Sequence, residues 1–314
     1  METTLTTDPT VAARYIREGR LAAFPTETVY GLGADAFQAS AVEQIFEAKG
    51  RPADNPLIVH VRERSQIEEV VASVPSVGQI LLEAFAPGPI TLILPKRDAL
   101  PGVVTAGLDT VGVRMPGLAR TQTFLAACET PVAAPSANRS GRPSPTSWEA
   151  VQADLGGRID CILQGERTEA GVESTVVDCT TAPPTVLRPG AVSVEALREV
   201  VGEVVETDDS DDAPKSPGTK HRHYAPAAEV QLVDEPPSPN EGEQAGYIGL
   251  DVPDGGDAFA LTHVAGTVDE YAHEVFHFFR RCDEAGCSVI FAQTVAETGL
   301  GRALNDRLRR AAAR

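Results

Sequence analysis

Two segments rich in glycine, proline and hydroxyl side chains most constrain how this chain folds. The first covers residues 24–57 and contains FPTETVYGLG and KGRPADNPL, and the second covers residues 133–146 and reads AAPSANRSGRPSPT. Glycine and proline favour tight loops between regular elements. The loops also carry lysine, arginine, serine, threonine and asparagine, whose donors suit a bound polyanion. The sequence therefore predicts a polyanion site built from loops.

A helix is predicted immediately before the cationic part of the first loop. Ser40 and Glu43 fit a capping box that begins a helix, and Gly50 is suited to end it. Lys49 then lies at the end of this helix. Arg51 precedes a proline, which biases it toward extended backbone.

Residues two apart on an extended segment share a side, so Lys49 and Arg51 can point into one pocket. The same spacing relates Ser136 to Asn138. In the alternative interpretation, Lys49 only complements the helix dipole and Arg51 is a surface cation. Ser136 and Asn138 would then simply form turns.

The order of apolar runs and helical patterns predicts an α/β domain built on one twisted sheet. Asp8 and Pro9 predict the start of a first helix, and Ser193 predicts the start of a later helix that ends near Gly202. The predicted strands cover residues 21–24, 57–61, 90–94, 111–115, 161–163, 174–178 and 185–187.

The composition changes sharply after this domain. Residues 206–220 read ETDDSDDAPKSPGTK and hold no apolar side chain large enough to anchor a core. We predict a first domain of residues 1–203, a linker of residues 204–227 and a second domain of residues 228–314. The second domain is predicted to be a small Rossmann-like α/β fold, with strands at 229–233, 245–250 and 287–292 and helices at 268–285 and 302–313.

Charge and cysteine content disfavour several classes of function. A formal net charge of −18 opposes nonspecific binding of nucleic acids. Five cysteines without a C-x-x-C pair predict buried thiols, not a disulfide framework or a zinc ribbon. The N-terminal sequence METTLTTDPT has no basic start or apolar run, and no stretch approaches the length of a membrane span. We therefore expect a cytoplasmic protein that does not bind membranes.

A series of short motifs, in a fixed order, resembles the YrdC-like threonylcarbamoyl-AMP synthases. The motifs are PTETVYGLG from Pro25, KGRP from Lys49, NPLIVHV from Asn55, PGPITLIL from Pro87, TAGLDTVGVRMP from Thr105, APSANRSGRPSPT from Ala134, GVEST from Gly171 and LRPGAV from Leu187. SPGTKHRHYAP, from Ser216, looks like the linker of the two-domain members, with Thr219 where methionine is common.

The resemblance implies an open, twisted sheet around a concave cavity, followed by a small accessory domain. It also implies condensation of L-threonine, bicarbonate and ATP to threonylcarbamoyl-AMP with release of pyrophosphate. ATP would be a substrate, and Mg²⁺ is expected with ligands that the sequence does not identify. The product would pass to a tRNA threonylcarbamoyl transferase complex that forms N6-threonylcarbamoyladenosine, with weak or absent direct binding of tRNA.

The resemblance also assigns roles to individual residues. Those expected to act in catalysis are Lys49, Arg51, Ser136 and Asn138. Those expected to bind ATP are Lys49, Arg51, Asn55, Thr110, Ser136, Ser144, Arg188 and Tyr224. Those expected to bind L-threonine are Thr26, His60, Arg114, Ala134 and Ser174. Tyr224 and its linker neighbours are further expected to close over bound ATP.

Plainer interpretations stay open for several of these residues. His60 could be a strand histidine with a satisfied hydrogen bond, and Arg114 could belong to a surface ion pair. Glu27 and Tyr30 are expected only to shape the pocket.

The segment from His273 to His277 fits H-E-x-x-H, a pattern in which two histidines bind zinc and Glu274 serves as a base. A third ligand is not evident, although Glu297 is a candidate. An apolar stripe with both histidines on the polar flank explains the same helix. We therefore predict no metal site.

Two other functions remain as alternatives. A concave YrdC-like domain could act as an RNA-binding module without synthase activity, although the net acidity opposes this. A related carbamoyl-adenylate enzyme of hydrogenase maturation would normally carry acylphosphatase and zinc-finger-like modules, and neither is found in this sequence.

Overall fold

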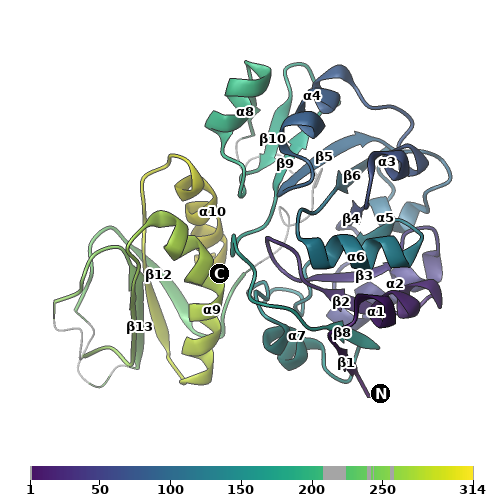
Figure 1. The fold of residues 1–314 in the computed structure, drawn as a ribbon. Coiled ribbons are helices and arrows are strands. Elements are labelled where there is room, and N and C mark those ends of the chain that lie inside the picture. The colour runs from purple at the N-terminus through teal and green to yellow at the C-terminus, as the bar shows by residue number, and fades with distance from the viewer. Residues whose placement is uncertain (1, 208–223, 239–241, 243, 255–257, 314) are drawn as a thin grey trace.

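The computed structural model describes residues 2–207, 224–238, 242, 244–254 and 258–313, which form two α/β units (Figure 1). In the described part of the first unit, eleven strands form one mixed sheet in the order β1-β8-β2-β3-β7-β4-β6-β5-β9-β10-β11. The strands are β1 (Thr4–Thr6), β2 (Ala22–Phe24), β3 (Gly31–Asp35), β4 (Ile58–His60), β5 (Ile90–Pro95), β6 (Thr110–Arg114), β7 (Val132–Ala134), β8 (Cys161–Leu163), β9 (Thr175–Asp178), β10 (Thr185–Arg188) and β11 (Val205–Glu206).

Helices pack around this sheet (Figure 1). They are α1 (Pro9–Arg17), α2 (Ala39–Lys49), α3 (Arg64–Val70), α4 (Ser76–Phe85), α5 (Gly102–Thr105), α6 (Ala119–Cys128), α7 (Trp148–Leu155) and α8 (Val194–Val201). The predicted twisted-sheet α/β fold is confirmed. None of the described helices is both long and apolar enough to cross a bilayer.

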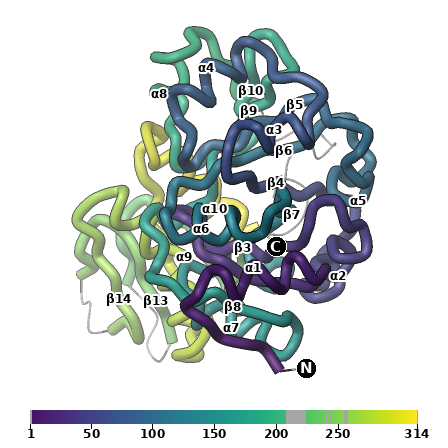
Figure 2. Tube along the Cα trace, turned by 45° about the vertical axis from the view of Figure 1, so that its right-hand side comes forward, coloured from purple at the N-terminus to yellow at the C-terminus, as the bar shows by residue number. Residues whose placement is uncertain are grey.

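The second unit is a parallel sheet in the order β12-β15-β13-β14, as expected for a Rossmann-like fold. Its elements are β12 (Glu229–Val233), β13 (Ala245–Gly249), β14 (Leu261–Val264), α9 (Val268–Glu284), β15 (Val289–Gln293) and α10 (Leu300–Ala312). Helices α9 and α10 lie between this sheet and the first unit (Figure 1). After a turn of 45° about the vertical axis, α10 is still seen against the first unit (Figure 2).

The two units share apolar packing. Val29 of the first unit and Tyr224 belong to the same buried cluster as Phe276 of α9 and Leu304 of α10. The rings of Tyr224 and Phe276 are stacked, with centroids 5.3 Å apart. Burial of such aromatic surface fixes the second unit against the loop that follows β2.

The start of α2 differs from the prediction. The helix begins at Ala39, Gln38 occupies the N-cap position without a side-chain capping hydrogen bond, and Ser40 lies in the first turn. Asp35 organises the entry to the helix, because its carboxylate accepts hydrogen bonds from the main chain of Phe37 and the side chain of Gln38. The capping-box prediction is therefore wrong. Gly50 does end the helix, with a left-handed φ of 63°.

Most predicted strands are confirmed within one or two residues. The sequence did not predict β1, β3, β7, β11 or β14, because short strands, and in β3 two glycines, give little periodic signal. All five cysteines are free and buried, as predicted. The predicted domain limits stay a prediction, although β11 lies inside the predicted linker and pairs with β10. Of the expected closing segment, residues 208–223 lie outside the described residues.

Candidate active site

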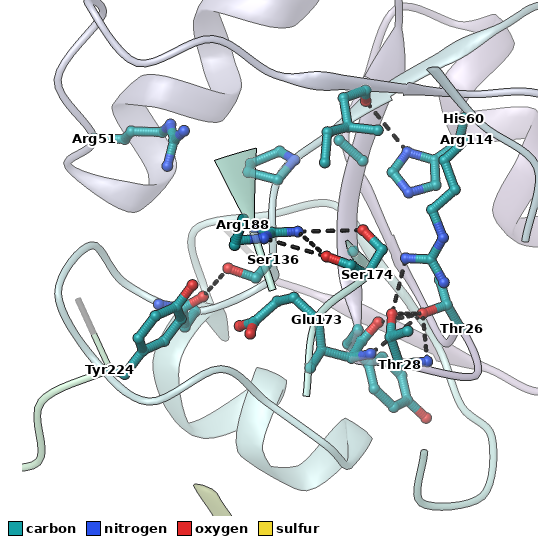
Figure 3. Close-up of a pocket in the computed structure, with 17 residues that line it drawn as sticks. Thr26, Thr28, Arg51, His60, Arg114, Ser136, Glu173, Ser174, Arg188 and Tyr224 are labelled. Atoms are coloured by element: carbon teal, nitrogen blue, oxygen red, sulfur yellow. Dashed lines mark hydrogen bonds between the residues drawn. The ribbon is translucent and has the colours of Figure 1, made fainter. Parts of the chain in front are cut away.

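A cavity lies over the central strands of the first unit, walled by the loops that follow β2 and β7 (Figure 3). Most of the predicted site residues line it. These are Thr26, Arg51, His60, Arg114, Ala134, Ser136, Asn138, Ser174, Arg188 and Tyr224. The sheet explains part of this convergence, since β4 and β6 are parallel neighbours and pair His60 with Arg114 in register.

Lys49 does not line this cavity but lies behind its wall. Its ammonium donates a 2.6 Å hydrogen bond to the carbonyl of Ser136 and another to the carbonyl of Asn138. The main-chain amide of Ser140 donates to the carbonyl of Lys49 at 3.0 Å. Lys49 therefore fastens the loop after β7 to the end of α2. Burial, followed by the nearby charge of Arg51, places the pKa of Lys49 well below its ordinary value.

Arg51 lies in the wall of the cavity on the turn that follows α2. Its guanidinium donates to the carbonyls of Asn55 and Pro56, the latter at 3.1 Å. Burial lowers the pKa of Arg51 to about 10, so it stays cationic at neutral pH. Neither polar atom of the buried Asn55 side-chain amide has a hydrogen-bond partner among the described residues. Asn55 is not among the residues that line the cavity.

Ser136 and Asn138 form a compact pair at the tip of the second loop. The Ser136 hydroxyl donates to Asn138 Oδ1 at 2.5 Å, and Asn138 Nδ2 donates to the carbonyls of Arg139 and Arg142. Both residues line the cavity. The turn contacts of the alternative interpretation are therefore present, in residues that also line the cavity.

His60 is buried, and its Nδ1 lies 3.2 Å from the carbonyl of Ile58. Burial, then the charge of Arg114, lowers the pKa of His60 to about 3. The imidazole is therefore neutral at physiological pH. The satisfied hydrogen bond of the plainer interpretation is present, and the same residue also lines the cavity.

Arg114 forms an ion pair, but the pair is buried. The guanidinium donates to Glu27 Oε1 at 2.7 Å and to the Thr28 hydroxyl at 2.8 Å, and only 5% of the Arg114 side chain is exposed. Burial would raise the pKa of Glu27, but the charge and hydrogen bond of Arg114 outweigh it, and that pKa is lowered. Glu27 and Thr28 therefore orient Arg114 beside the cavity.

The remaining predicted residues have less direct positions. Ser144 is buried and donates to Glu173, and Thr110 begins β6, at the opposite end of that strand from Arg114. Neither residue lines the cavity as described. Arg188 donates to the carbonyl of Ser174 at 2.9 Å and to its hydroxyl at 3.2 Å.

Sequence reasoning missed two polar residues that line the cavity, Thr28 and Glu173. Thr28 lies in the PTETVYGLG motif and Glu173 lies in GVEST, so the motifs contained them without identifying a role. Glu173 is the one acidic side chain among the described residues that line the cavity. A carboxylate in a cationic cavity is an observation that only the structure provides.

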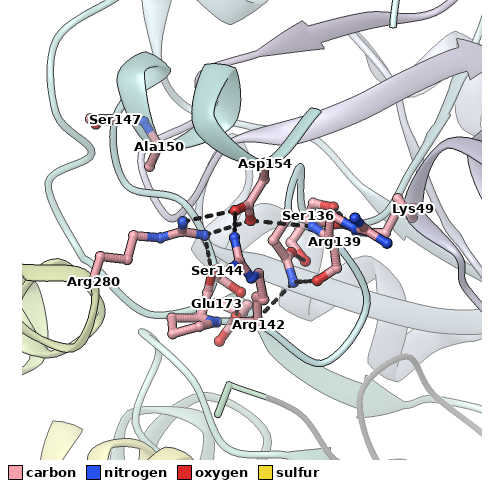
Figure 4. Close-up of polar contacts among 12 residues, drawn as sticks. Lys49, Ser136, Arg139, Arg142, Ser144, Ser147, Ala150, Asp154, Glu173 and Arg280 are labelled. Carbon is pink, nitrogen blue, oxygen red and sulfur yellow. Dashed lines mark hydrogen bonds and ion pairs between the residues drawn. The ribbon is translucent and has the colours of Figure 1, made fainter. Parts of the chain in front are cut away.

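A second buried carboxylate, Asp154, supports the loop after β7 from outside the cavity (Figure 4). It accepts hydrogen bonds from the amide of Arg139 and the guanidinium of Arg142. Arg280 of α9 forms a further ion pair with it at 2.9 Å. Arg280 also donates to the carbonyl of Pro143, so the second unit contacts the loop that carries Ser136 and Asn138.

The H-E-x-x-H segment is engaged in an ion pair between the two units. Both oxygens of Glu274 accept hydrogen bonds from Arg167, at 3.1 and 3.2 Å. Within the described ranges, no group of three or more histidine, cysteine or acidic side chains is arranged to hold a metal ion.

The fold and the cavity define an α/β protein with a cationic, loop-walled site of the YrdC type, joined to a parallel α/β accessory domain. A family model described as "Telomere recombination" matches residues 14–190, and one described as "Threonylcarbamoyl-AMP synthase, C-terminal domain" matches residues 192–313. This chain belongs to the two-domain threonylcarbamoyl-AMP synthase family.

Relatives agree over nearly the full length of the chain. The threonylcarbamoyl-AMP synthase of Pyrococcus abyssi is 46% identical over 318 residues, covering 96% of this chain and 93% of the relative. The Bacillus subtilis protein of the same name is 41% identical and covers 98% of this chain and 94% of the relative. The crystal structure of P. abyssi Sua5 complexed with L-threonine has a TM-score of 0.91 and 44% identity, and it covers 99% of this chain and 97% of that chain.

Proposed function

We propose that this protein is an L-threonylcarbamoyladenylate synthase, a nucleotidyltransferase that condenses L-threonine, bicarbonate and ATP. The observation that carries the proposal is the convergence of Arg51, Arg114 and Arg188 on one cavity. The cavity lies in a chain that matches named synthases over almost its whole length.

The reaction requires the protein to position the three substrates, and it requires no covalent intermediate with a protein side chain. The amine of threonine forms a C–N bond with bicarbonate and water leaves, which gives a carbamate. A carboxylate oxygen of this carbamate then attacks the α-phosphorus of ATP. The bond between that phosphorus and the bridging oxygen breaks, and pyrophosphate leaves. Cations and fixed dipoles that stabilise the charge on the transferring group account for catalysis of this type.

At the threonine end, Arg114 is suited to grip the amino-acid carboxylate. Glu27 and Thr28 hold its guanidinium in place from behind. Thr26, Ala134 and Ser174 complete the pocket for the rest of the molecule. The neutral imidazole of His60 offers a hydrogen bond without adding charge.

At the nucleotide end, Arg51 and Arg188 would bind phosphate oxygens, and Ser136 and Asn138 would bind the reacting groups. The main role of Lys49 is to hold the loop that carries Ser136 and Asn138. Asn55, Thr110, Ser144 and Tyr224 are proposed to support the nucleotide. Of these four residues Tyr224 lines the cavity.

Mg²⁺ fits this chemistry as a partner of the ATP phosphates, because it usually keeps several waters and binds few protein carboxylates. Glu173 is a poor ligand here, because Ser144 and Arg307 already donate to its two oxygens. When bound, the ion would neutralise charge on the triphosphate.

The proposal places the reaction in the cytoplasm as the first step of N6-threonylcarbamoyladenosine formation in tRNA. The product would pass to a tRNA threonylcarbamoyl transferase complex. A net charge of −18 argues that tRNA binds to that complex and weakly or not at all to this protein.

The test is threonine-dependent release of pyrophosphate from ATP in the presence of labelled bicarbonate, with detection of the labelled adenylate. Arg51→Ala and Lys49→Ala should abolish it, whereas Arg97→Ala, at an exposed position outside the cavity, should not. Full activity in both site variants would refute the site. Tight RNA binding at physiological salt without pyrophosphate release would favour the RNA-binding alternative.

A further inference from the structure

Glu173 is the single acidic side chain among the described residues that line the cavity (Figure 3). Hydrogen bonds from both units hold its carboxylate. Its Oε1 accepts a 2.5 Å hydrogen bond from the Ser144 hydroxyl of the first unit. Its Oε2 accepts a 2.6 Å hydrogen bond from Arg307 Nε of α10 in the second unit. One oxygen is thus bound by each of the two units.

Several contacts besides the one with Glu173 fix the position of Arg307. Its side chain is fully buried, and it donates to the carbonyl of Pro189 at 2.9 Å as well as to Asp306. Its guanidinium carbon lies 5.3 Å from the centre of the Tyr224 ring. A buried arginine satisfied in this way has a fixed geometry, since rotation of the guanidinium would break several hydrogen bonds at once.

The charge of Arg307 helps to keep the Glu173 carboxylate ionised. Burial alone would raise the pKa of Glu173, but the charges of Arg307 and Arg188 and the hydrogen bonds from Ser144 and Arg307 outweigh it, and that pKa is lowered. Glu173 is therefore an anion beside the site that must accept the polyanion ATP. Unless it is compensated, such a charge repels phosphate and attracts the nearest phosphate-binding cation.

That cation is Arg188. Arg188 and Glu173 are close enough to influence each other electrostatically, yet Arg188 donates to Ser174. The pairing of Glu173 with Arg307 explains this arrangement, because the carboxylate is already neutralised by a cation from outside the cavity. Arg188 therefore remains a residue of the cavity lining.

We propose that Arg307 of the C-terminal domain is a positioning residue of the synthase site, which neutralises Glu173 and so keeps Arg188 oriented toward the phosphates of ATP. This inference rests on the proposed function. It assigns the C-terminal domain a direct electrostatic role in nucleotide binding. Arg280 contacts Asp154 of the first unit in a similar way, outside the cavity.

The test compares R307Q, E173Q and the double variant R307Q/E173Q in the full-length protein. In R307Q, the KM for ATP should rise at least about tenfold, because one partner of a buried, hydrogen-bonded charge pair is lost. The KM for threonine should change little. In the double variant both charges are removed, and the KM for ATP should return to within about threefold of the wild-type value. Arg309→Gln, on the exposed side of the same helix, is the matched control.

The pH dependence separates an electrostatic role from a structural one. The charged and titratable groups that face Glu173 are Arg307 of α10, Arg188 of β10, and Tyr224, and Asp306 of α10 contacts Arg307. In R307Q the carboxylate loses its main cation, so its pKa should rise. The ratio of variant to wild-type KM for ATP should then shrink as the pH is lowered from 8.5 to 6 and the carboxylate is protonated. E173Q and the double variant should not show this dependence.

Binding of a non-hydrolysable ATP analogue by calorimetry distinguishes failure of this inference from failure of the proposed function. If the wild-type protein binds the analogue but releases no threonine-dependent pyrophosphate, the proposed function is refuted. The role of Arg307 is then tested by the affinities of the variants for the analogue. Wild-type affinity in R307Q would overturn the inference. So would a folded double variant that stays as impaired as R307Q. If R307Q does not fold, the affinities of E173Q and of the double variant for the analogue test the inference. Tenfold weaker binding of the analogue by E173Q would overturn the inference.

Discussion

The ammonium of Lys49 donates a 2.6 Å hydrogen bond to the main-chain carbonyl of Ser136. The lysine that the sequence places at the centre of a phosphate site therefore supports the loop of that site from behind. A phosphate in the cavity would meet Arg51 and the tip of this loop before it met Lys49.

Lys49→Met should destabilise the protein as well as inactivate it. The methionine keeps the apolar stem but leaves the buried carbonyls of Ser136 and Asn138 without their donor. Unsatisfied buried groups of this kind cost about 1–3 kcal/mol of unfolding free energy. Urea denaturation measures the change, and Lys96→Met, at a position outside the cavity, is the control. An unchanged midpoint in Lys49→Met would contradict the loop-holding role.

Arg114→Lys should impair the use of threonine selectively. Lysine keeps one positive charge but cannot contact Glu27, Thr28 and a carboxylate with the geometry of a guanidinium. We expect the KM for threonine to rise by about tenfold or more, with the KM for ATP nearly unchanged. Steady-state pyrophosphate release at varied threonine and varied ATP gives both constants. An equal rise in both would place Arg114 at a shared contact, contrary to this assignment.

His60 should make the protein less stable in mild acid. Its pKa is about 3 in the folded protein and near 6.5 in an unfolded chain, so the unfolded state binds the proton more readily. The contribution to stability is fully present above about pH 6.5 and is lost as the pH falls toward 3, by roughly 1–2 kcal/mol down to pH 5. His60→Gln should flatten the fall in unfolding free energy between pH 7 and 5. Parallel curves for the two proteins would show that His60 does not titrate in this way.

Gly171→Ala should loosen the contact between the two units. Gly171 has a φ of 70°, and an added β-carbon would overlap the Cα of His273 and the carbonyl of Ala272 in α9. The left-handed backbone alone costs about 1–2 kcal/mol for alanine, and the overlap adds about 1–3 kcal/mol. Gly286→Ala is a matched control, because Gly286 has a φ of 72° and open space around it.

Thermal unfolding and limited proteolysis measure this difference. The Gly171 variant should unfold at a lower temperature than the Gly286 variant and should be cleaved faster near residues 204–227. Equal melting temperatures in the two variants would mean that α9 can move away from residue 171 without loss of unfolding free energy.

Much of the fold could be predicted from the sequence, because its signals are local. Asp8 and Pro9 begin α1, Ser193 caps α8 and Gly50 ends α2, as predicted. The capping box at Ser40 failed because Asp35, outside the pattern, accepts the hydrogen bonds that set where α2 begins. Short strands such as β7 were missed because they are defined by their neighbours in the sheet and carry little pattern of their own.

The sequence by itself determined the loops, their donors and the family to which the chain belongs, because these depend on local residue types and their order. Only the tertiary structure decided that Lys49 faces two carbonyls and that Glu173 meets Arg307, 134 residues further along the chain. No local propensity encodes such pairs. The Lys49 contacts follow from the packing of the end of α2 against the loop after β7, and the Glu173–Arg307 contact follows from the packing of α10 against the first unit. In both places burial makes each charge and hydrogen bond depend on the partner that the fold supplies.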